Sequence, residues 1–436
     1  MLVWIYSQVS KGDIRMPPSL STSTSVKAEN ISFSKLLKSR SFTALWLGQT
    51  FSQFGDAILW VALPLTVYSM GQSTLQMGFV MGLLMLPQVL LLPFTGILVD
   101  RVSRSKVMMI TDSFRCTLVI GLSVLAKEHQ LTVPLLYTFV LLFGSMDALF
   151  QPAYSATRAE VFTPDIRNRA NGLTQVSQQA ARLLGPAIGG AAIGLATVAA
   201  GFAIDALTLF VSVSSLAFLH LGAPERTSLK TSGALLGFLH ELTGGFQELR
   251  KHQWLWITII AFAFINIASS GISTILLPWL IKVHLGLSAA LYGLVSSASG
   301  IGAIVCALVY GRRKQWHKRG LIAYAGVAGS GIAGLALVFV HSPFLLMVVT
   351  AASSACIMMF GLTWEGSLQE LVAKDAFGRV ASLDMFGSFA LLPVGNILTG
   401  WLAMKVGGIA TIALDAIFIL LVTFAVLMVP SIRQFD

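Results

Sequence analysis

Polar and acidic side chains interrupt an apolar segment near residue 56, and their spacing indicates proton chemistry. Gln49, Ser52, Gln53 and Asp56 recur at spacings of three and four residues. On an α-helix this spacing places the four side chains on one face. A polar stripe on an otherwise apolar helix predicts a face that borders a water-filled cavity, where Asp56 would take up and release a proton. The alternative is a structural carboxylate that pairs with a neighbouring helix.

A basic side chain, Arg182, lies deep within the apolar segment 171–195. Its guanidinium group does not lose its proton, so it needs a permanent partner, and Asp56 and Asp147 are the candidates. Two interpretations stay open. In the first, protonation of the aspartate frees the arginine and shifts a conformational equilibrium; in the second, the ion pair is static. Asp147 is also a candidate counter-ion for a cationic substrate.

Further polar side chains are candidates for lining a transport path. Glu365 and Trp364 lie in the polar segment GLTWEGSLQ, where the indole ring could contact a cation. Asn266 is a weaker cavity candidate. Structural roles are favoured for three other acids: Asp205, Asp384 and Asp415. The aromatic and methionine candidates for the cavity are Met81, Met85, Phe143, Phe150, Phe262, Phe264 and Trp279.

The helices that must position these side chains are evident from composition. The chain has 436 residues, of which 55% are hydrophobic and only 11% charged, and its mean hydropathy is +0.79. Soluble proteins carry charge on about a quarter of their residues, and about 20 apolar residues span a bilayer as a helix. The sequence predicts an all-α membrane protein with twelve spans: 42–70, 75–99, 106–126, 132–152, 171–195, 197–221, 254–281, 289–310, 320–340, 343–366, 380–404 and 407–429.

The distribution of basic residues predicts the orientation in the membrane. If the N-terminus is cytoplasmic, the inner segments hold 24 of the 29 basic residues and the outer loops hold only three. Positive residues concentrate on the cytoplasmic side of membrane proteins. We therefore expect a multi-pass protein of the plasma membrane with both termini in the cytoplasm. The net charge of +10 is explained by this bias and by anionic lipid, without a nucleic-acid partner.

An internal repeat indicates two related halves. A shift of 210 residues aligns Gly190 with Gly400, Asp205 with Asp415 and Gly185 with Gly395. Parallel six-helix repeats are typical of transporters that rock about a central site. The expected organisation is a disordered cytoplasmic tail, an N-terminal six-helix bundle, a cytoplasmic linker with an amphipathic helix, a C-terminal six-helix bundle and a second cytoplasmic tail: 1–40, 41–222, 223–253, 254–430 and 431–436.

Three segments resemble motifs of the major facilitator superfamily. GILVDRVSRSK, residues 96–106, resembles motif A between the second and third helices. LLGPAIGG resembles motif C of proton-driven antiporters, and QPAYSATRAEVFTPDIRNRANGL resembles a segment of the drug-efflux branch that includes macrolide exporters and relatives of siderophore and lysophospholipid transporters. The sequence departs from the family at Ser103 and Ala181, where glycine is usual, and at Tyr310, where the second copy of motif A would have its aspartate.

The resemblance implies an inner gate and an antiporter-like packing segment. Asp100 would face the start of the eleventh helix, and Arg101 or Arg104 would pair with Glu160, in contacts that break on inward opening. The residues of this gate are Gly96, Asp100, Arg101, Arg104, Lys106, Glu160 and Arg379. Motif C would pack the fifth helix against the opposite half and limit leakage, through Gly185, Pro186, Gly189 and Gly190.

The sequence thus predicts a secondary transporter of the major facilitator fold that works by alternating access. The expected activity is proton-coupled efflux of hydrophobic or cationic small molecules. Alternatives are a flippase for an amphiphile such as lysophospholipid, a siderophore exporter, and uptake of a small solute. No phosphate-binding loop, metal-ligand cluster or catalytic set occurs in the sequence, so we expect no enzyme activity, no cofactor and an ion gradient, of protons, as the energy source. The expected form is a monomer.

Overall fold

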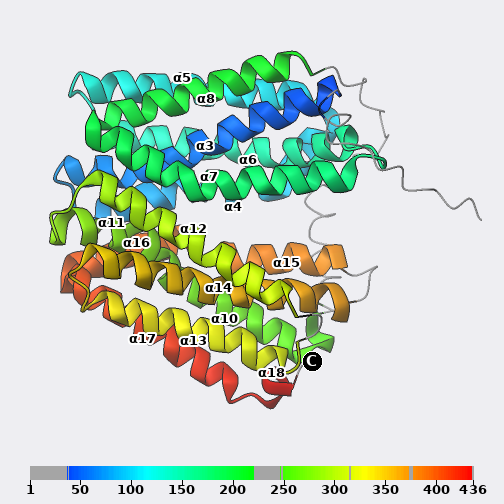
Figure 1. Ribbon diagram of the computed structural model, residues 1–436, viewed down its shortest axis with the longest axis vertical. Helices are drawn as coiled ribbons and strands as arrows, with labels where there is room; N and C mark the ends of the chain where they lie inside the picture. The colour runs from blue at the N-terminus through cyan, green and yellow to red at the C-terminus, as the bar shows by residue number, and fades with distance from the viewer. Residues whose placement is uncertain are drawn as a thin grey trace, which may run out of the picture.

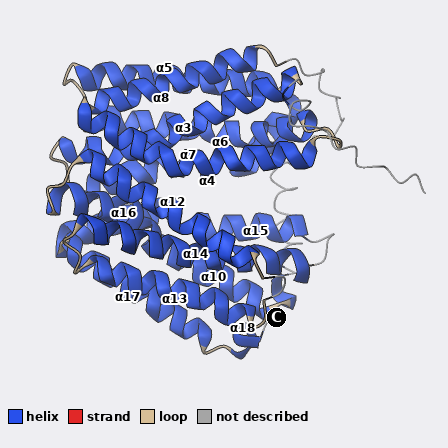
Figure 2. Ribbon diagram, viewed as in Figure 1, coloured by secondary structure: helices blue, strands red, loops and turns tan. Residues whose placement is uncertain are grey.

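The computed structural model describes residues 37, 39–219, 246, 249–313, 316–372 and 377–434, and every regular element in these ranges is helical (Figure 2). The all-α prediction is confirmed. Most of the predicted N-terminal tail and most of the predicted linker with its amphipathic helix lie outside the described residues. The same is true of the side-chain surroundings of residues 92–94, 96–101, 378, 379 and 434, which include four of the predicted gate residues, Gly96, Asp100, Arg101 and Arg379.

Six long helices make up the N-terminal half, shown in the upper part of Figure 1. They follow one another with short connections and pack together. Their bounds are α3 (Arg40–Ser69), α4 (Thr74–Arg101), α5 (Arg104–Lys127), α6 (Val133–Val161), α7 (Arg167–Leu195) and α8 (Val198–Ala217).

The C-terminal half lies in the lower part of Figure 1 and has two irregular spans. The first begins with α10 (Gln253–Ser270) and continues through π-helical turns on both sides of α11 (Leu277–Trp279) to His284. The second is broken between α15 and α16, just before Pro393, whose ring nitrogen cannot donate a hydrogen bond. The remaining bounds are α12 (Ala289–Gly311), α13 (Arg319–Leu337), α14 (Pro343–Leu371), α15 (Phe377–Phe389), α16 (Leu392–Val406), α17 (Gly408–Leu427) and α18 (Pro430–Gln434).

Within the described residues, ten helical segments are long and apolar enough to cross a membrane. The helices α3 and α7 are not among the ten, although they contain 30 and 29 residues. Both carry the polar side chains that drew attention in the sequence. The chain is therefore a multi-pass integral membrane protein, while the count of twelve spans stays a prediction.

The buried apolar side chains form one core shared by both halves and two separate cores. We call the end of the bundle where α3 begins and α17 ends the termini end, and the other the opposite end. The shared core gathers residues such as Leu63 and Ile275 toward the opposite end. At the termini end, one core contains only N-terminal residues and another only C-terminal residues. The halves are thus sealed together at the opposite end and packed independently at the termini end.

Close backbone contacts produce the seal at the opposite end. A Cβ atom on Gly190 of α7 would lie 2.8 Å from the Cα of Gly293 in α12, and a Cβ on Gly400 of α16 would lie 3.2 Å from the Cα of Gly78 in α4. Small residues allow helices in a membrane to approach this closely. Gly190 and Gly400 are the repeat-related pair found in the sequence, so equivalent positions seal both sides of the interface.

Candidate functional site

A cavity of about 680 Å³ lies between the two halves. Its N-terminal wall comes from α3, α4 and α7. Its C-terminal wall comes from α10 and the π-helical turns after it, and from α12, α13, α14, α15, α16 and α17. Drug-sized ligands occupy pockets of about 300–1,000 Å³. The position between the halves and the volume make this cavity the candidate substrate site.

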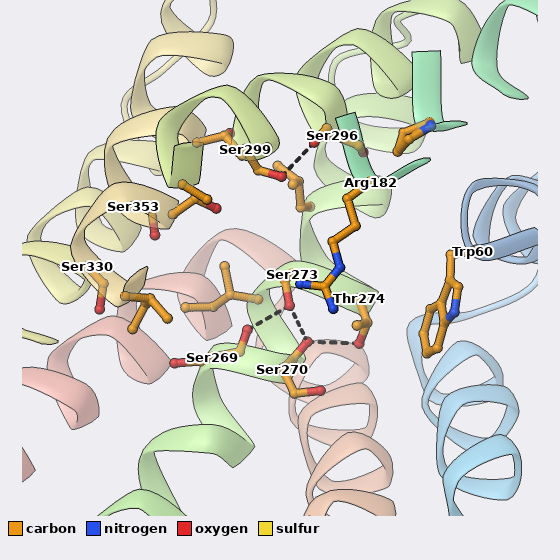
Figure 3. A pocket seen from close by; sticks show the side chains of 18 of the residues that line it. Trp60, Arg182, Ser269, Ser270, Ser273, Thr274, Ser296, Ser299, Ser330 and Ser353 are labelled. Atoms are coloured by element: carbon orange, nitrogen blue, oxygen red, sulfur yellow. Dashed lines mark hydrogen bonds between the residues drawn. The ribbon is translucent and has the colours of Figure 1, made fainter. Parts of the chain in front are cut away.

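The two walls of this cavity differ in chemistry. The N-terminal wall is largely apolar, with Trp60, Gln179 and Arg182 as its polar or amphipathic members. The C-terminal wall is rich in hydroxyl groups, from Ser269, Ser270, Ser273, Thr274, Tyr292, Ser296, Ser299, Ser330, Thr350, Ser353 and Ser354. Figure 3 shows the Arg182 side chain reaching from α7 toward Ser270, Ser273 and Thr274. Of the described residues that line the cavity, Arg182 is the one with a charge.

A second pocket of about 140 Å³ lies within the N-terminal half and contains the charged residues expected in a coupling site. Asp56 of α3, Arg115 of α5 and Asp147 of α6 line it. Trp60, one helical turn after Asp56, lines both this pocket and the large cavity. The indole ring is therefore a shared wall between the candidate substrate site and an ionisable site.

Arg115 is the centre of a buried ionic network. Its side chain is 1% exposed, donates to Asp56 through Nη2, and donates to Asp112 through Nη1 over 3.3 Å. The guanidinium carbon also lies 4.5 Å from the centre of the Phe143 ring. Cation–π contacts of this kind strengthen when the cation is removed from water. The network thus holds one permanent cation between two carboxylates and an aromatic face.

Hydrogen bonds extend this network from α5 to α8 and α3. The Ser212 hydroxyl donates to Asp112 over 2.7 Å, and the Gln49 amide donates to Ser212 over 3.2 Å. Asp112 is completely buried, whereas the side chain of Asp56 is 32% exposed and faces the smaller pocket. The more accessible of the two carboxylates is therefore the one that can exchange protons with water.

The structure corrects the expected partner of Asp56, which is Arg115 and not Arg182. The sequence interpretation placed Arg182 as the basic residue deep in a span and assigned no role to Arg115 or Asp112. The spacing of Asp112 and Arg115, three residues apart within an apolar helix, was the available signal, because such pairs face each other on a helix. Arg182 instead faces the large cavity, and the structure shows no ion pair for it among the described residues.

Asp147, the other proposed partner of Arg182, lies in the smaller pocket. It accepts hydrogen bonds from Gln88 over 2.7 Å and from Gln151 over 3.4 Å. The two amides come from α4 and from the next turn of α6. They hold the carboxylate near Arg115 and Asp56, away from the cavity that Arg182 lines.

The other predicted cavity residues divide between the site and the core. Asn266 lines the large cavity and donates to the Ser388 carbonyl over 3.0 Å. Trp364 instead packs in the C-terminal core and donates to Asp384. Glu365 and Gln53 line neither of the two pockets. Of the aromatic and methionine candidates, Met81 lines the large cavity and Phe143 the smaller pocket.

Ion pairs at the termini end repeat between the halves. Arg104 at the start of α5 lies 3.2 Å from Glu160 near the end of α6, and Arg319 at the start of α13 lies 2.6 Å from Glu370 near the end of α14. Glu160 and Glu370 are related by the shift of 210 residues. The second half therefore has a pair equivalent to Arg104–Glu160, although Tyr310 replaces the aspartate of its copy of motif A. Lys106 is exposed.

The motif C residues pack α7 against both halves. The Gly185 and Gly189 backbones lie against Ala57 and Ile58 of α3. Gly190 faces α12, where a Cβ atom on Gly293 would lie 2.3 Å from the Pro186 carbonyl oxygen. Pro186 also lines the large cavity. One segment therefore joins the seal at the opposite end to the wall of the cavity.

The helical architecture and the site between two halves define the fold of the major facilitator superfamily. Residues 32–436 match the family described as transmembrane secretion effectors, and the chain belongs to this family. It resembles a bacterial homologue of the human lysosomal transporter Spinster, in an inward-facing and occupied conformation, with a TM-score of 0.68 and 14% identity; the match covers 90% of this chain and 96% of that one.

Two relatives of known name match over nearly their whole length. Macrolide efflux protein A of Streptococcus pyogenes is 22% identical over 399 residues, which cover 91% of this chain and 97% of that protein. The enterobactin exporter EntS of Salmonella choleraesuis (strain SC-B67) is 25% identical over 410 residues, which cover 88% and 93%. The sequence prediction of an efflux-type transporter of this superfamily is confirmed.

Proposed function

We propose that this protein exports small hydrophobic or amphiphilic molecules by alternating access and that a proton gradient drives the transport. The observation that carries the proposal is the cavity between halves that share a core at one end and pack separately at the other. Alternating access needs a central site whose two seals form and break in turn. The names of the macrolide and enterobactin relatives support export as the direction.

We also propose that the termini end faces the cytoplasm. This end carries the basic residues Arg104, Arg158, Arg312 and Arg319, among others, and positive residues favour the cytoplasmic side. The described conformation is then closed to the outside and open to the inside. The Arg104–Glu160 ion pair is intact in it, so the expectation that this contact breaks on inward opening does not hold for this conformation. We place the protein in the plasma membrane, as a non-enzymatic monomer that needs no cofactor.

Proton coupling is assigned to Asp56, with Arg115 as its partner. Arg115 balances one carboxylate, yet it contacts both Asp56 and Asp112 in a buried site. An unbalanced charge in the membrane interior is costly, so a proton on one of the carboxylates stabilises the cluster. Asp56 is the one with access to the smaller pocket. Trp60 then provides a physical route by which a change at Asp56 alters the substrate cavity.

The test is transport in proteoliposomes that contain the purified protein and carry an imposed pH gradient. The compounds are a macrolide, a lipophilic cationic dye, a catecholate siderophore and a lysophospholipid. We expect faster movement of at least one compound with the gradient than without it, in vesicles with protein but not in empty vesicles. If the gradient accelerates none of them, proton-driven transport is refuted. Movement of the lysophospholipid alone favours the second candidate function, that of a lipid flippase.

A further inference from the structure

The large cavity contains a permanent positive charge and no opposing charge among the described residues that line it. We propose that its substrates are amphiphiles that carry an oxyanion (a carboxylate, sulfonate or phosphate), and that Arg182 is the counter-ion for this group. The inference rests on the proposed transport function and assigns the substrate class of the same cavity.

The two arginines within the spans provide the first argument. Arg115 is 1% exposed and its guanidinium is held by Asp56 and Asp112. Arg182 is exposed to the cavity, and the structure shows no hydrogen bond or ion pair for its side chain among the described residues. Charged side chains in a membrane protein generally pair or face a water-filled path. The unpaired guanidinium is therefore available to a ligand, and it presents five N–H donors that fit an oxyanion.

The position of the carboxylates provides the second argument. Asp56 and Asp147 line the smaller pocket, where Arg115 and two glutamine amides already contact them. The large cavity has no acidic residue among the described residues that line it. A cation in this cavity would meet a like charge, whereas an anion would meet an opposite one. The effective dielectric constant near a protein surface is lower than that of bulk water, so such a difference in charge sign favours the anion.

Three hydroxyl groups on the other wall are not available as donors to an oxyanion. Ser273, Thr274 and Ser299 donate their protons to main-chain carbonyls of their own helices, over 2.6–3.2 Å, and Figure 3 shows several of these bonds. Their free lone pairs can accept hydrogen bonds. The cavity thus offers the donors of Arg182 together with acceptors on the wall that this side chain faces. A fitting substrate has an oxyanion for Arg182 and hydroxyl or N–H groups for these acceptors.

The test uses two dyes that differ by one sulfonate. These are 8-anilino-1-naphthalenesulfonate and its neutral analogue N-phenyl-1-naphthylamine. Binding to the full chain in nanodiscs is measured by equilibrium dialysis, with empty nanodiscs subtracted and no pH gradient. The variants are Arg182→Gln, which removes the charge, and Arg182→Lys, which keeps it. Arg433→Gln, an exposed arginine of α18, is the matched control.

We expect the wild-type protein to bind the sulfonate at least about tenfold more tightly than the neutral dye. A hydrogen bond to a charged group lowers the dissociation constant by a factor of about 10 to 100. Arg182→Gln should abolish this preference and leave the affinity for the neutral dye within about twofold. Arg182→Lys should retain part of the preference, and Arg433→Gln all of it.

Equal affinity of the wild-type protein for the two dyes overturns the proposal, and this result does not require any variant to fold. Equal weakening of both dyes in Arg182→Gln, or an unchanged preference, overturns it as well. Displacement of the sulfonate by lysophosphatidylglycerol would extend the site to lipid phosphates, and failure to displace it would restrict the site to soluble anions. Selective binding without gradient-driven movement would refute proton-driven transport while leaving Arg182 as the anion site.

Discussion

The strongest consequence of the ionic network concerns the variant Arg115→Gln. In the folded protein, Asp112 is completely buried and depends on Arg115 and the Ser212 hydroxyl for its interactions. Removal of the guanidinium leaves this carboxylate with the hydroxyl alone. Loss of one partner of a buried ion pair costs about 3–5 kcal/mol because the remaining charge is uncompensated. We therefore expect the free energy of unfolding to fall by about 3–5 kcal/mol.

The assay is reversible unfolding in detergent, followed by helix circular dichroism, in a double-mutant cycle. The double variant Asp112→Asn/Arg115→Gln has no unpaired charge at this position, so it should be more stable than Arg115→Gln alone. Such recovery measures the coupling between two contacting residues. The control Arg433→Gln is exposed and should change the free energy by less than about 0.5 kcal/mol. A loss below about 1 kcal/mol for Arg115→Gln, or no recovery in the double variant, would refute the assigned pairing.

Three further predictions concern the seal, the ion pair at the termini end and the second buried acid. Gly293→Val places a Cβ atom 2.3 Å from the Pro186 carbonyl oxygen, so the transport rate should fall at least about tenfold. The control is Gly311→Val, whose Cβ atom would have no neighbour within 4 Å, and this variant should transport at the wild-type rate. Glu160→Gln breaks a pair that is more than a third exposed, so unfolding measurements should show a loss below about 1 kcal/mol. Neither carboxyl oxygen of Asp205 has a hydrogen-bond partner among the described residues, so Asp205→Asn should unfold at an equal or higher temperature; a lower one would show that these oxygens make a stabilising interaction.

Sequence periodicity predicted the helices well because hydropathy depends on local composition. The shift of 210 residues also identified pairs whose surroundings match in the structure. Gly190 and Gly400 both lie against a glycine of the other half, and Glu160 and Glu370 both pair with an arginine at the start of a helix. Repeated helices occupy equivalent positions, so a repeat in the sequence carries information about packing.

The partners of the charged residues could not be predicted in the same way. The sequence prediction paired Asp56 with Arg182. The actual partner depends on how α3 and α5 are rotated about their axes. Packing sets that rotation, through contacts such as the one between Arg115 and Phe143. The prediction that Trp364 lines the transport path was wrong for a related reason. An indole side chain can line a cavity or pack in a core, and the sequence does not distinguish the two.

The proposed coupling at Asp56 is tested most directly in proteoliposomes that contain the variant Asp56→Asn. Two rates of substrate transport are measured in them: accumulation driven by a pH gradient, and exchange without a gradient. Exchange of labelled for unlabelled substrate needs the cavity and its two seals, whereas accumulation also needs the proton. Arg115 keeps Asp112 as a partner in this variant, so the protein should remain folded. We predict that exchange continues within about threefold of the wild-type rate and that accumulation driven by the pH gradient is lost. Accumulation at the wild-type level would contradict the account.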